Sequence, residues 1–536
     1  MARLHPGGRH VRDWSLQTLG AGALLAALDI LFFFTGCDQP SPRTPALPPA
    51  ATAAPRAPAP TPAPAPALEA ERSPWELDVP APAGFDRAAS AGQTLALLQA
   101  LIAQDTQNPP GNELRVAREL AARLAGVAGV TVTVLEDAGE GRANLVARLA
   151  AGQPRERPVL VLAHMDTVNV QPERWETPPL QPTLKDGYLY GRGAIDDKGM
   201  LAAATVALVA LAPRRAELTR DVILLATAAE EGGPDVGVQL VLEQHRELLG
   251  DAEFALNEGG RIRIVEGAIA AVNLQTTEKL AYDVLVTSEG PSGHASVPDP
   301  ANALAALARA VARVSNWRAP LRLNETTRAF LGGLQPVDPD PRRRQDLADL
   351  LAGDPDRDPL AKAAGERLSD DRLLNSILRT GQSLTLIHGG IRNNVIPSTG
   401  TATFNVRALP DDDITQIVAA MAAVGGEPGV RFELEGPVHV APPASGTGTA
   451  LYRALERAGA EMAPHALVLP YMSTGATDGA ALRAAGIPTY GILPFPLALE
   501  DELRMHGDNE RVPVAALGWG AEYLYRTLSA VSSPGS

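Results

Sequence analysis

Five short clusters of acidic residues, histidines and glycines are the part of this chain that could bind metal ions. They are His164-Met165-Asp166, Gly191–Gly199 with Asp196 and Asp197, Glu230-Glu231, Asn257-Glu258, and His506–Glu510. Imidazole nitrogens and carboxylate oxygens are the ligands that zinc takes at protein sites without cysteine ligands. Each cluster taken alone is also typical of a solvated turn, so its chemical meaning depends on where the fold places it.

Apolar runs precede three of these clusters and predict the strands that carry them. The runs are Pro158–Ala163, Asp221–Thr227 and Phe254–Leu256, which end shortly before His164, Glu230 and Glu258, respectively. Unbroken apolar runs of this length suit strands that are covered on both faces. Because functional groups in open α/β sheets gather at the carboxyl ends of the strands, we expect the clusters to meet on one rim.

Such a rim would bring together two histidines and several carboxylates. This donor set suits two zinc ions, with one carboxylate shared between them. A glutamate that lies beside the ions without binding them could remove the proton from a bound water molecule. The sequence therefore predicts metal-assisted hydrolysis as the chemistry of this rim.

Helical and strand patterns alternate from about residue 90, as in a doubly wound sheet. Near Leu274 the pattern changes to β-α-β-β-α-β, and from about Pro442 the first rhythm resumes. The predicted fold class is α/β, with a doubly wound mixed-sheet catalytic domain and an inserted α+β, ferredoxin-like lid domain. The catalytic domain would comprise residues 76–273 and 440–536, and the lid would comprise residues 274–439. Residues 318–375 are a polar insertion whose place and role the sequence does not indicate.

The N-terminus predicts export and a tether. Residues 1–37 contain arginines, then an apolar stretch, and end in Phe34-Thr35-Gly36-Cys37, which resembles a lipoprotein cleavage box with Phe in place of the usual Leu. An uncleaved signal anchor is the alternative. Residues 38–75 are rich in Pro and Ala and predict an extended linker. We expect a bacterial cell-envelope protein on the periplasmic side, lipid-anchored through Cys37, or else a secreted one; this N-terminus would be its only membrane contact.

Composition limits the remaining possibilities. The formal charge is −15 and the pI about 5.2, which argues against nucleic acid as a partner. One cysteine excludes an intrachain disulfide and a thiolate metal cluster. Any metal must therefore be held by His, Asp and Glu.

The five motifs, in this order, resemble the aminoacylase and glutamate-carboxypeptidase family of dizinc exopeptidases over residues 90–525. The segment 376–397 and the insertion before it look most like the secreted branch of N-acyl-amino-acid hydrolase/synthases and Gly-Xaa carboxypeptidases. The resemblance implies that His164 and Glu258 bind one Zn²⁺, that Glu231 and His506 bind the other, and that Asp196 bridges both. Asp196 is preferred to Asp197 because it takes the last position of the family's Gly-x-Gly-x-x-Asp. Some relatives carry Asp where this chain has Glu258.

The same resemblance assigns catalytic roles. Glu230 would be the general base that activates a water bridging the ions, and Asp166 would orient the far nitrogen of His164. In the lid, Gly293-His294-Ala295-Ser296 resembles the family's Gly-His-x-Ser, whose histidine steadies the oxyanion, often from the partner subunit. His294 could also be structural.

Three further residues are candidates for substrate binding. Asn394, in Asn394-Val395-Ile396-Pro397, could contact the substrate or shape a turn. Arg407 matches a family arginine suited to a substrate carboxylate, which a guanidinium binds bidentately. Gly475 could offer its backbone N–H to the same group.

We therefore expect a hydrolase, either a metallopeptidase or an aminoacylase. It would release an amino acid from a peptide C-terminus or from an N-acyl amino acid. The substrates would be small peptides or N-acyl amino acids, and the lid could pair two copies of the chain. The alternative is a catalytically inactive, peptide-binding envelope lipoprotein. All the ligand positions and Glu230 are filled, which argues for the enzyme.

Overall fold

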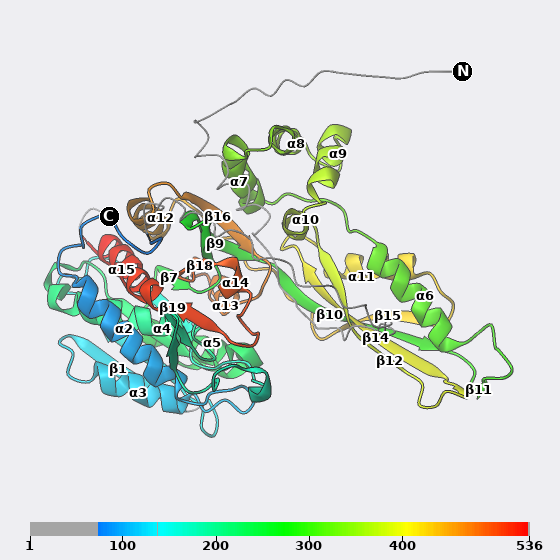
Figure 1. Cartoon of the computed structure of the whole chain (residues 1–536), viewed down its shortest axis with the longest axis horizontal. Coiled ribbons are helices and arrows are strands. Elements are labelled where there is room, and N and C mark those ends of the chain that lie inside the picture. Colours follow the sequence, from blue (N-terminus) through cyan, green and yellow to red (C-terminus); the bar gives the residue numbers. More distant parts are fainter. Residues whose placement is uncertain (1–72, 137, 534–536) are drawn as a thin grey trace, which may run out of the picture.

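The structure, a computed structural model, describes residues 73–136 and 138–533. The predicted signal segment 1–37 with Cys37, and the linker 38–75 up to residue 72, lie outside the described residues. The described chain contains a large sheet with helices, a smaller sheet with two helices, and a group of helices between them (Figure 1).

The large sheet has ten strands in the order β1-β2-β6-β3-β7-β17-β9-β8-β18, with β16 paired to β9. The strands are β1 (Val130–Leu135), β2 (Asn144–Leu149), β3 (Val159–His164), β6 (Val222–Thr227), β7 (Phe254–Asn257), β8 (Arg261–Val265), β9 (Ala268–Glu278), β16 (Leu467–Ser473), β17 (Thr489–Gly491) and β18 (Pro496–Ala498). Strand β3 is parallel to β6 and β7, whereas β2 is antiparallel to β6. The predicted mixed sheet is thus confirmed.

Helices cover both faces of this sheet, as the unbroken apolar runs predict. They are α2 (Arg87–Ile102), α3 (Leu114–Leu124), α4 (Lys198–Leu211), α5 (Val238–Gln244), α12 (Ala450–Met462), α13 (Gly479–Ala484), α14 (Leu499–Glu502) and α15 (Val514–Val531). Val161 of β3 belongs to the core that contains α4 and α15, and its neighbour Leu160 to the core that contains α5. Successive residues of a strand point to opposite faces, so β3 is buried on both.

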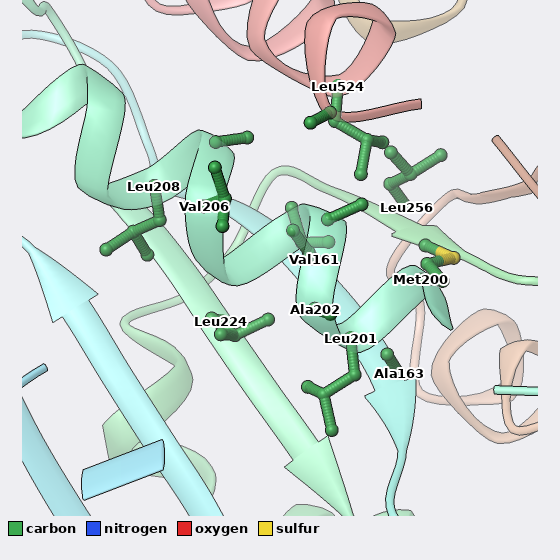
Figure 2. Packing of buried hydrophobic residues seen from close by; sticks show 14 of the residues in the cluster. Val161, Ala163, Met200, Leu201, Ala202, Val206, Leu208, Leu224, Leu256 and Leu524 are labelled. Atoms are coloured by element: carbon green, nitrogen blue, oxygen red, sulfur yellow. The ribbon is translucent and has the colours of Figure 1, made fainter. Parts of the chain in front are cut away.

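Helix α4 lies at the centre of the larger core. Figure 2 shows Met200, Leu201 and Val206 of this helix packed among Val161 of β3 and Leu524 of α15. The stretch Lys198–Glu217, which is α4 with the following turn, is long and apolar enough to span a membrane, but 67% of its apolar window is buried in the protein. Its apolar surface is therefore used for packing, which stabilises the sheet that carries the rim.

The lid contains four antiparallel strands in the order β12-β14-β10-β15 and two helices. In chain order the elements are β10 (Leu280–Glu289), α6 (Ala303–Asn316), β12 (Gly381–Gly389), β14 (Thr399–Ala408), α11 (Ile414–Gly425) and β15 (Val430–Glu435). This is the predicted β-α-β-β-α-β order. Both helices pack on one face of the sheet, where Val284, Leu307, Phe404 and Ile417 share one core. The two sheets meet at Lys279, because β9 ends at Glu278 and β10 begins at Leu280.

The insertion 318–375 is helical and covers β16. Its helices are α7 (Glu325–Leu334), α8 (Pro341–Ala352), α9 (Pro359–Leu368) and α10 (Arg372–Leu378). A carboxylate or amide oxygen caps each N-terminus, as in Asn324 and Asp371. Leu331 of α7 and Leu374 of α10 share a core with Tyr471 of β16. Figure 1 shows this group of helices between the two sheets.

Candidate metal centre

The five motif clusters meet at one rim of the ten-stranded sheet. Three overlapping groups have ligand atoms within 4.8 Å of one another: His164 with Asp196 and Glu258, Asp196 with Glu231 and His506, and His164 with Glu230 and Glu231. Strands β3, β6 and β7 end at or just before His164, Glu230 and Glu258. His506 lies in the loop before β19 (Arg511–Pro513), far away in the chain. The shared location that the sequence could only predict is therefore present.

Asp196 occupies the centre of the cluster. Its Oδ1 lies 3.0 Å from Nε2 of His164, and its Oδ2 lies 3.0 Å from Nε2 of His506. Nε2 of His506 is also 3.0 Å from Oε1 of Glu231, and Nε2 of His164 is 3.9 Å from Oε1 of Glu258. The two oxygens of Asp196 thus face two separate groups of donors, which is the arrangement required of a bridging carboxylate.

Asp197, the alternative to Asp196, belongs to none of these groups. Its carboxylate is fully buried, and neither oxygen has a hydrogen-bond partner among the described residues. It lies directly before α4, with no capping bond from its side chain. The geometry therefore favours Asp196 as the shared ligand.

Asp166 fastens His164 to the turn that carries the two glutamates. Its Oδ1 accepts the N–H of Glu230 at 3.2 Å and its Oδ2 accepts the N–H of Glu231 at 3.1 Å. Nδ1 of His164 lies 3.1 Å from the backbone carbonyl oxygen of Asp166 and 3.4 Å from its Oδ1. Orientation of a metal-binding histidine by a carboxylate on its far nitrogen is common in metal sites. The buried Asp166 therefore fits the orienting role and extends it to Glu230.

Glu510 performs a similar task for Asp196 and His506. Its carboxylate accepts the N–H groups of Gly193, Ile195 and Asp196 at 3.1, 2.8 and 3.1 Å. The Arg192 guanidinium donates to Glu510 at 2.7 Å and to the carbonyl of Gly507 at 2.8 Å. These bonds join the loop of Asp196 to the loop of His506. The sequence placed Glu510 in a motif cluster but gave it no role.

Crowding of acids shifts the pKa values at the rim. Burial would raise the pKa of Asp196, but its hydrogen bonds to His164 and His506 hold that pKa well below the usual range. Burial would lower the pKa of His506, yet its bonds to Asp196 and Glu231 raise it to about 11. Burial and the charge of Asp196 raise the pKa of Glu258 to about 8. Burial and the charge of Glu258 raise the pKa of Glu230 well above its ordinary value.

These shifts show that the rim concentrates negative charge in a buried place. Burying carboxylates is unfavourable unless positive charge compensates them. Divalent cations are such charges, and nitrogen and carboxylate donors of this kind are zinc ligands. The residues present therefore fit a pair of metal ions.

The lid candidates lie apart from this cluster in a single chain. His294, on β11 (Gly293–His294), is exposed and its Nδ1 lies 2.7 Å from Oγ of Ser296. Asn394 is exposed beside β13 (Val395–Ile396), the partner of β11, and Figure 1 places β11 at the end of the lid away from the large sheet. Arg407 is half-buried and donates to Asn405 at 2.9 Å. Their roles stay predictions.

Gly475 lies on the loop after β16. Its N–H donates to Oγ of Ser473 at 3.1 Å. This bond occupies the N–H that was expected to bind a substrate carboxylate. Its role also stays a prediction.

Comparison with known proteins gives one family and several relatives. Residues 160–530 match the family described as peptidase family M20/M25/M40. The human N-fatty-acyl-amino acid synthase/hydrolase PM20D1 is 26% identical over 389 residues, 71% of this chain and 75% of the relative. Human aminoacylase-1 is 25% identical over 381 residues, 70% of this chain and 80% of the relative.

A solved structure has the same fold. The M20 family metallo-carboxypeptidase Sso-CP2 from Sulfolobus solfataricus superposes with a TM-score of 0.60 at 18% identity, over 82% of this chain and 99% of the other. The fold class predicted from the sequence is confirmed by this similarity and by the strand order. Because residues 160–530 match this family and contain the residues of the rim, the chain belongs to peptidase family M20/M25/M40. It is an enzyme of the family's metallopeptidase and amidohydrolase class.

Proposed function

We propose that the chain is a zinc-dependent, exo-acting amide hydrolase that releases an amino acid from a peptide C-terminus or from an N-acyl amino acid. The observation that carries the proposal is the position of Asp196 between His164 and His506, with Glu230 beside them. One Zn²⁺ would be held by His164, Glu258 and Asp196, and the other by Asp196, Glu231 and His506. When bound, the ions would lower the pKa of a water molecule and polarise the amide carbonyl.

Glu230 supplies the proton transfers in this proposal. Its carboxylate accepts the proton of the attacking water and later gives it to the leaving nitrogen. Asp166 fixes Glu230 through the backbone N–H, so the side chain approaches the rim from a defined direction. The burial that raises the pKa of Glu230 also makes its carboxylate a better proton acceptor.

The exo-acting preference rests on Arg407. A guanidinium binds a free carboxylate bidentately, and burial lowers the pKa of Arg407, which reflects a partly desolvated cation. N-acyl amino acids are supported as substrates by the relatives whose names give acyl-amino-acid hydrolysis or aminoacylase activity. Peptides are supported by the carboxypeptidase with the same fold.

A homodimer through the lid is part of the proposal. Edge strand β12 exposes Leu386 by 53% and Ile387 by 55%, and an exposed apolar edge strand is suited to pairing with another chain. A second copy could present His294 to the rim, where an imidazole would steady the oxyanion. For location we propose the periplasmic side of a bacterial envelope with Cys37 as the lipid anchor, or secretion.

A substrate panel tests the proposal. The purified chain with Zn²⁺ is given N-acyl amino acids, dipeptides and the same dipeptides with an amidated C-terminus. We expect turnover of one of the first two classes and none of the amidated class. Equal turnover of amidated and free dipeptides would contradict the exo-acting mechanism, and binding of metal and peptide without turnover would favour the inactive binding protein.

A further inference from the structure

The segment before α3 forms a polar support behind the turn that carries Glu230 and Glu231. It follows α2 and reads Asn108-Pro109-Pro110-Gly111-Asn112-Glu113. The mechanism proposed above uses none of its residues. Asn108 and Glu113 are both buried and both contact groups of the rim.

Glu113 holds the backbone at the start of the turn. Its Oε1 accepts the N–H of Ala229 at 3.2 Å, and its side chain is fully buried. Ala229 has a φ of 58°, in the left-handed region that residues other than glycine seldom adopt. Since such a conformation persists only where the surroundings impose it, the bond to Glu113 is a direct means of holding the turn.

Glu113 is poorly compensated for a buried carboxylate. The nearest cationic atom, Nη1 of Arg142, lies 3.9 Å from Oε1. Oε2 has no hydrogen-bond partner among the described residues. A buried carboxylate with so few partners lowers the free energy of unfolding, so we look for a role of Glu113 other than stabilising the fold. Positioning of the adjacent turn is a role of that kind.

Asn108 supports the same turn from a second side. Its Nδ2 donates to Oδ2 of Asp166 at 2.8 Å, and its Oδ1 accepts from Arg142 at 2.7 Å. A Cβ atom at Gly232 would lie 2.3 Å from Nδ2 of Asn108, so the turn packs closely against the amide. Arg142 also donates to the carbonyl of Pro110, which ties the segment together.

We propose that Glu113 is a positioning residue, acting with Asn108 and Arg142, that sets the direction of Glu230 and the metal affinity of the ion held by Glu231. The inference rests on the proposed function, because it concerns the same two glutamates. Glu113 acts through the backbone of Ala229, and Asn108 acts through Asp166. The segment thus links the first helices of the domain to the reacting groups.

Substitution of Glu113 in the full chain tests the inference. Zn²⁺ affinity is measured by titration of the metal-free protein against a competing chelator, and kcat and KM on the best substrate of the panel. In Glu113→Ala we expect the weaker-bound Zn²⁺ to lose about 10–100-fold in affinity, and kcat to fall by a similar factor with KM little changed. Glu113→Gln keeps an oxygen acceptor for Ala229, so it should remain near wild type.

Glu522→Ala is the matched control. Glu522 is a fully buried glutamate on α15 that pairs with Arg87 and Arg526, away from the rim. Its removal should lower stability without changing Zn²⁺ affinity or kcat of the folded protein. Should Glu113→Ala not fold, Asn108→Ala is measured in the same way, with a smaller loss expected in the same direction.

The outcomes separate the two proposals. Wild-type affinity and kcat in Glu113→Ala, or in Asn108→Ala where that variant replaces it, would overturn the inference. A Glu113→Gln protein as impaired as Glu113→Ala would overturn it too, since the acceptor oxygen would then not matter. A wild-type chain that binds no pair of metal ions would overturn the proposed function itself.

Discussion

The rim of the large sheet and the end of the lid differ in how their polar side chains are satisfied. At the rim, Asp166 accepts the N–H groups of two residues and Glu510 those of three, and both are buried. At the end of the lid, the exposed imidazole of His294 contacts Ser296 of its own loop, through the Oγ and the backbone N–H. A single chain therefore preorganises the rim, whereas the proposed roles of the lid residues require closure of the lid or a second copy.

The physical reason is the way each region is connected. Parallel strands β3, β6 and β7 deliver His164, Glu230 and Glu258 to a common edge, whatever the rest of the chain does. The lid follows that sheet at Lys279, between β9 and β10, and β11 lies at the end of the lid away from the large sheet (Figure 1). The comparison predicts large effects of single substitutions at the rim and partner-dependent effects in the lid.

The largest expected effect is that of Asp196→Ala. Because its two oxygens face both donor groups, its removal should abolish binding of both ions, and with it measurable turnover. Metal content per folded chain by elemental analysis is the measurement. Retention of two ions would show that Asp197 or another carboxylate takes the bridging place.

His294→Ala is expected to lower kcat by about 10²–10³-fold, the usual loss for an oxyanion donor, while both ions stay bound. If a second copy supplies His294, mixing His294→Ala with inactive Glu230→Ala chains should restore part of the activity. Activity of the mixture is measured after dissociation and reassociation. No restoration would favour closure of the lid within one chain.

Breaking a buried ion pair at the rim should lower the free energy of unfolding more than breaking an exposed ion pair in the lid. Glu510→Ala leaves Arg192 buried without its partner and should lower the free energy of unfolding by about 3–5 kcal/mol. Glu289→Ala breaks an exposed pair with Arg431 in the lid and should change stability little. Denaturant unfolding of both variants compares the two regions, and equal losses would contradict the difference drawn between them.

The last effect concerns the junction of the two sheets and depends on pH. Burial lowers the pKa of Lys279 from 10.5 to about 7. Below about pH 7 the Lys279 ammonium is charged in the folded and in the unfolded chain, and its burial then destabilises the fold most. As the pH rises towards 10.5 the folded chain holds Lys279 neutral, and this destabilisation declines until the unfolded chain also loses the proton. The stabilisation of Lys279→Met relative to wild type should therefore be larger at pH 6 than at pH 10. A difference that does not vary with pH would show that Lys279 keeps its ordinary pKa.

The sequence predicted those parts of the fold that follow from local patterns. The apolar runs before His164 and Glu230 proved to be β3 and β6, and the alternating segments formed the lid sheet. Local patterns did not predict the pairing of distant segments, such as that of β16 with β9 across almost two hundred residues of chain. Nor did they predict that α7–α10 cover β16, because that contact depends on side-chain packing rather than on a sequence motif.

At the candidate site, the sequence predicted the metal-binding donors and the supporting residue Asp166, but it missed the other supporting residues. Asn108 and Glu113 lie in a segment whose Pro109-Pro110-Gly111 predicts only a break between helices. Their contacts with Asp166 and Ala229 arise from the folded chain. Glu510 lies directly before β19 and had a signal in its closeness to His506, yet no pattern gives the three N–H groups that its carboxylate accepts.

The central claim is that two metal ions bind at the rim and that Glu230 moves the proton. Its most direct test measures metal content and turnover of the same preparations of wild type and Glu230→Gln. We expect two ions per chain in both, with kcat lower by about 10²–10⁴-fold in Glu230→Gln. Equal turnover in the two proteins, or a wild-type chain that binds no metal ions, would contradict the account.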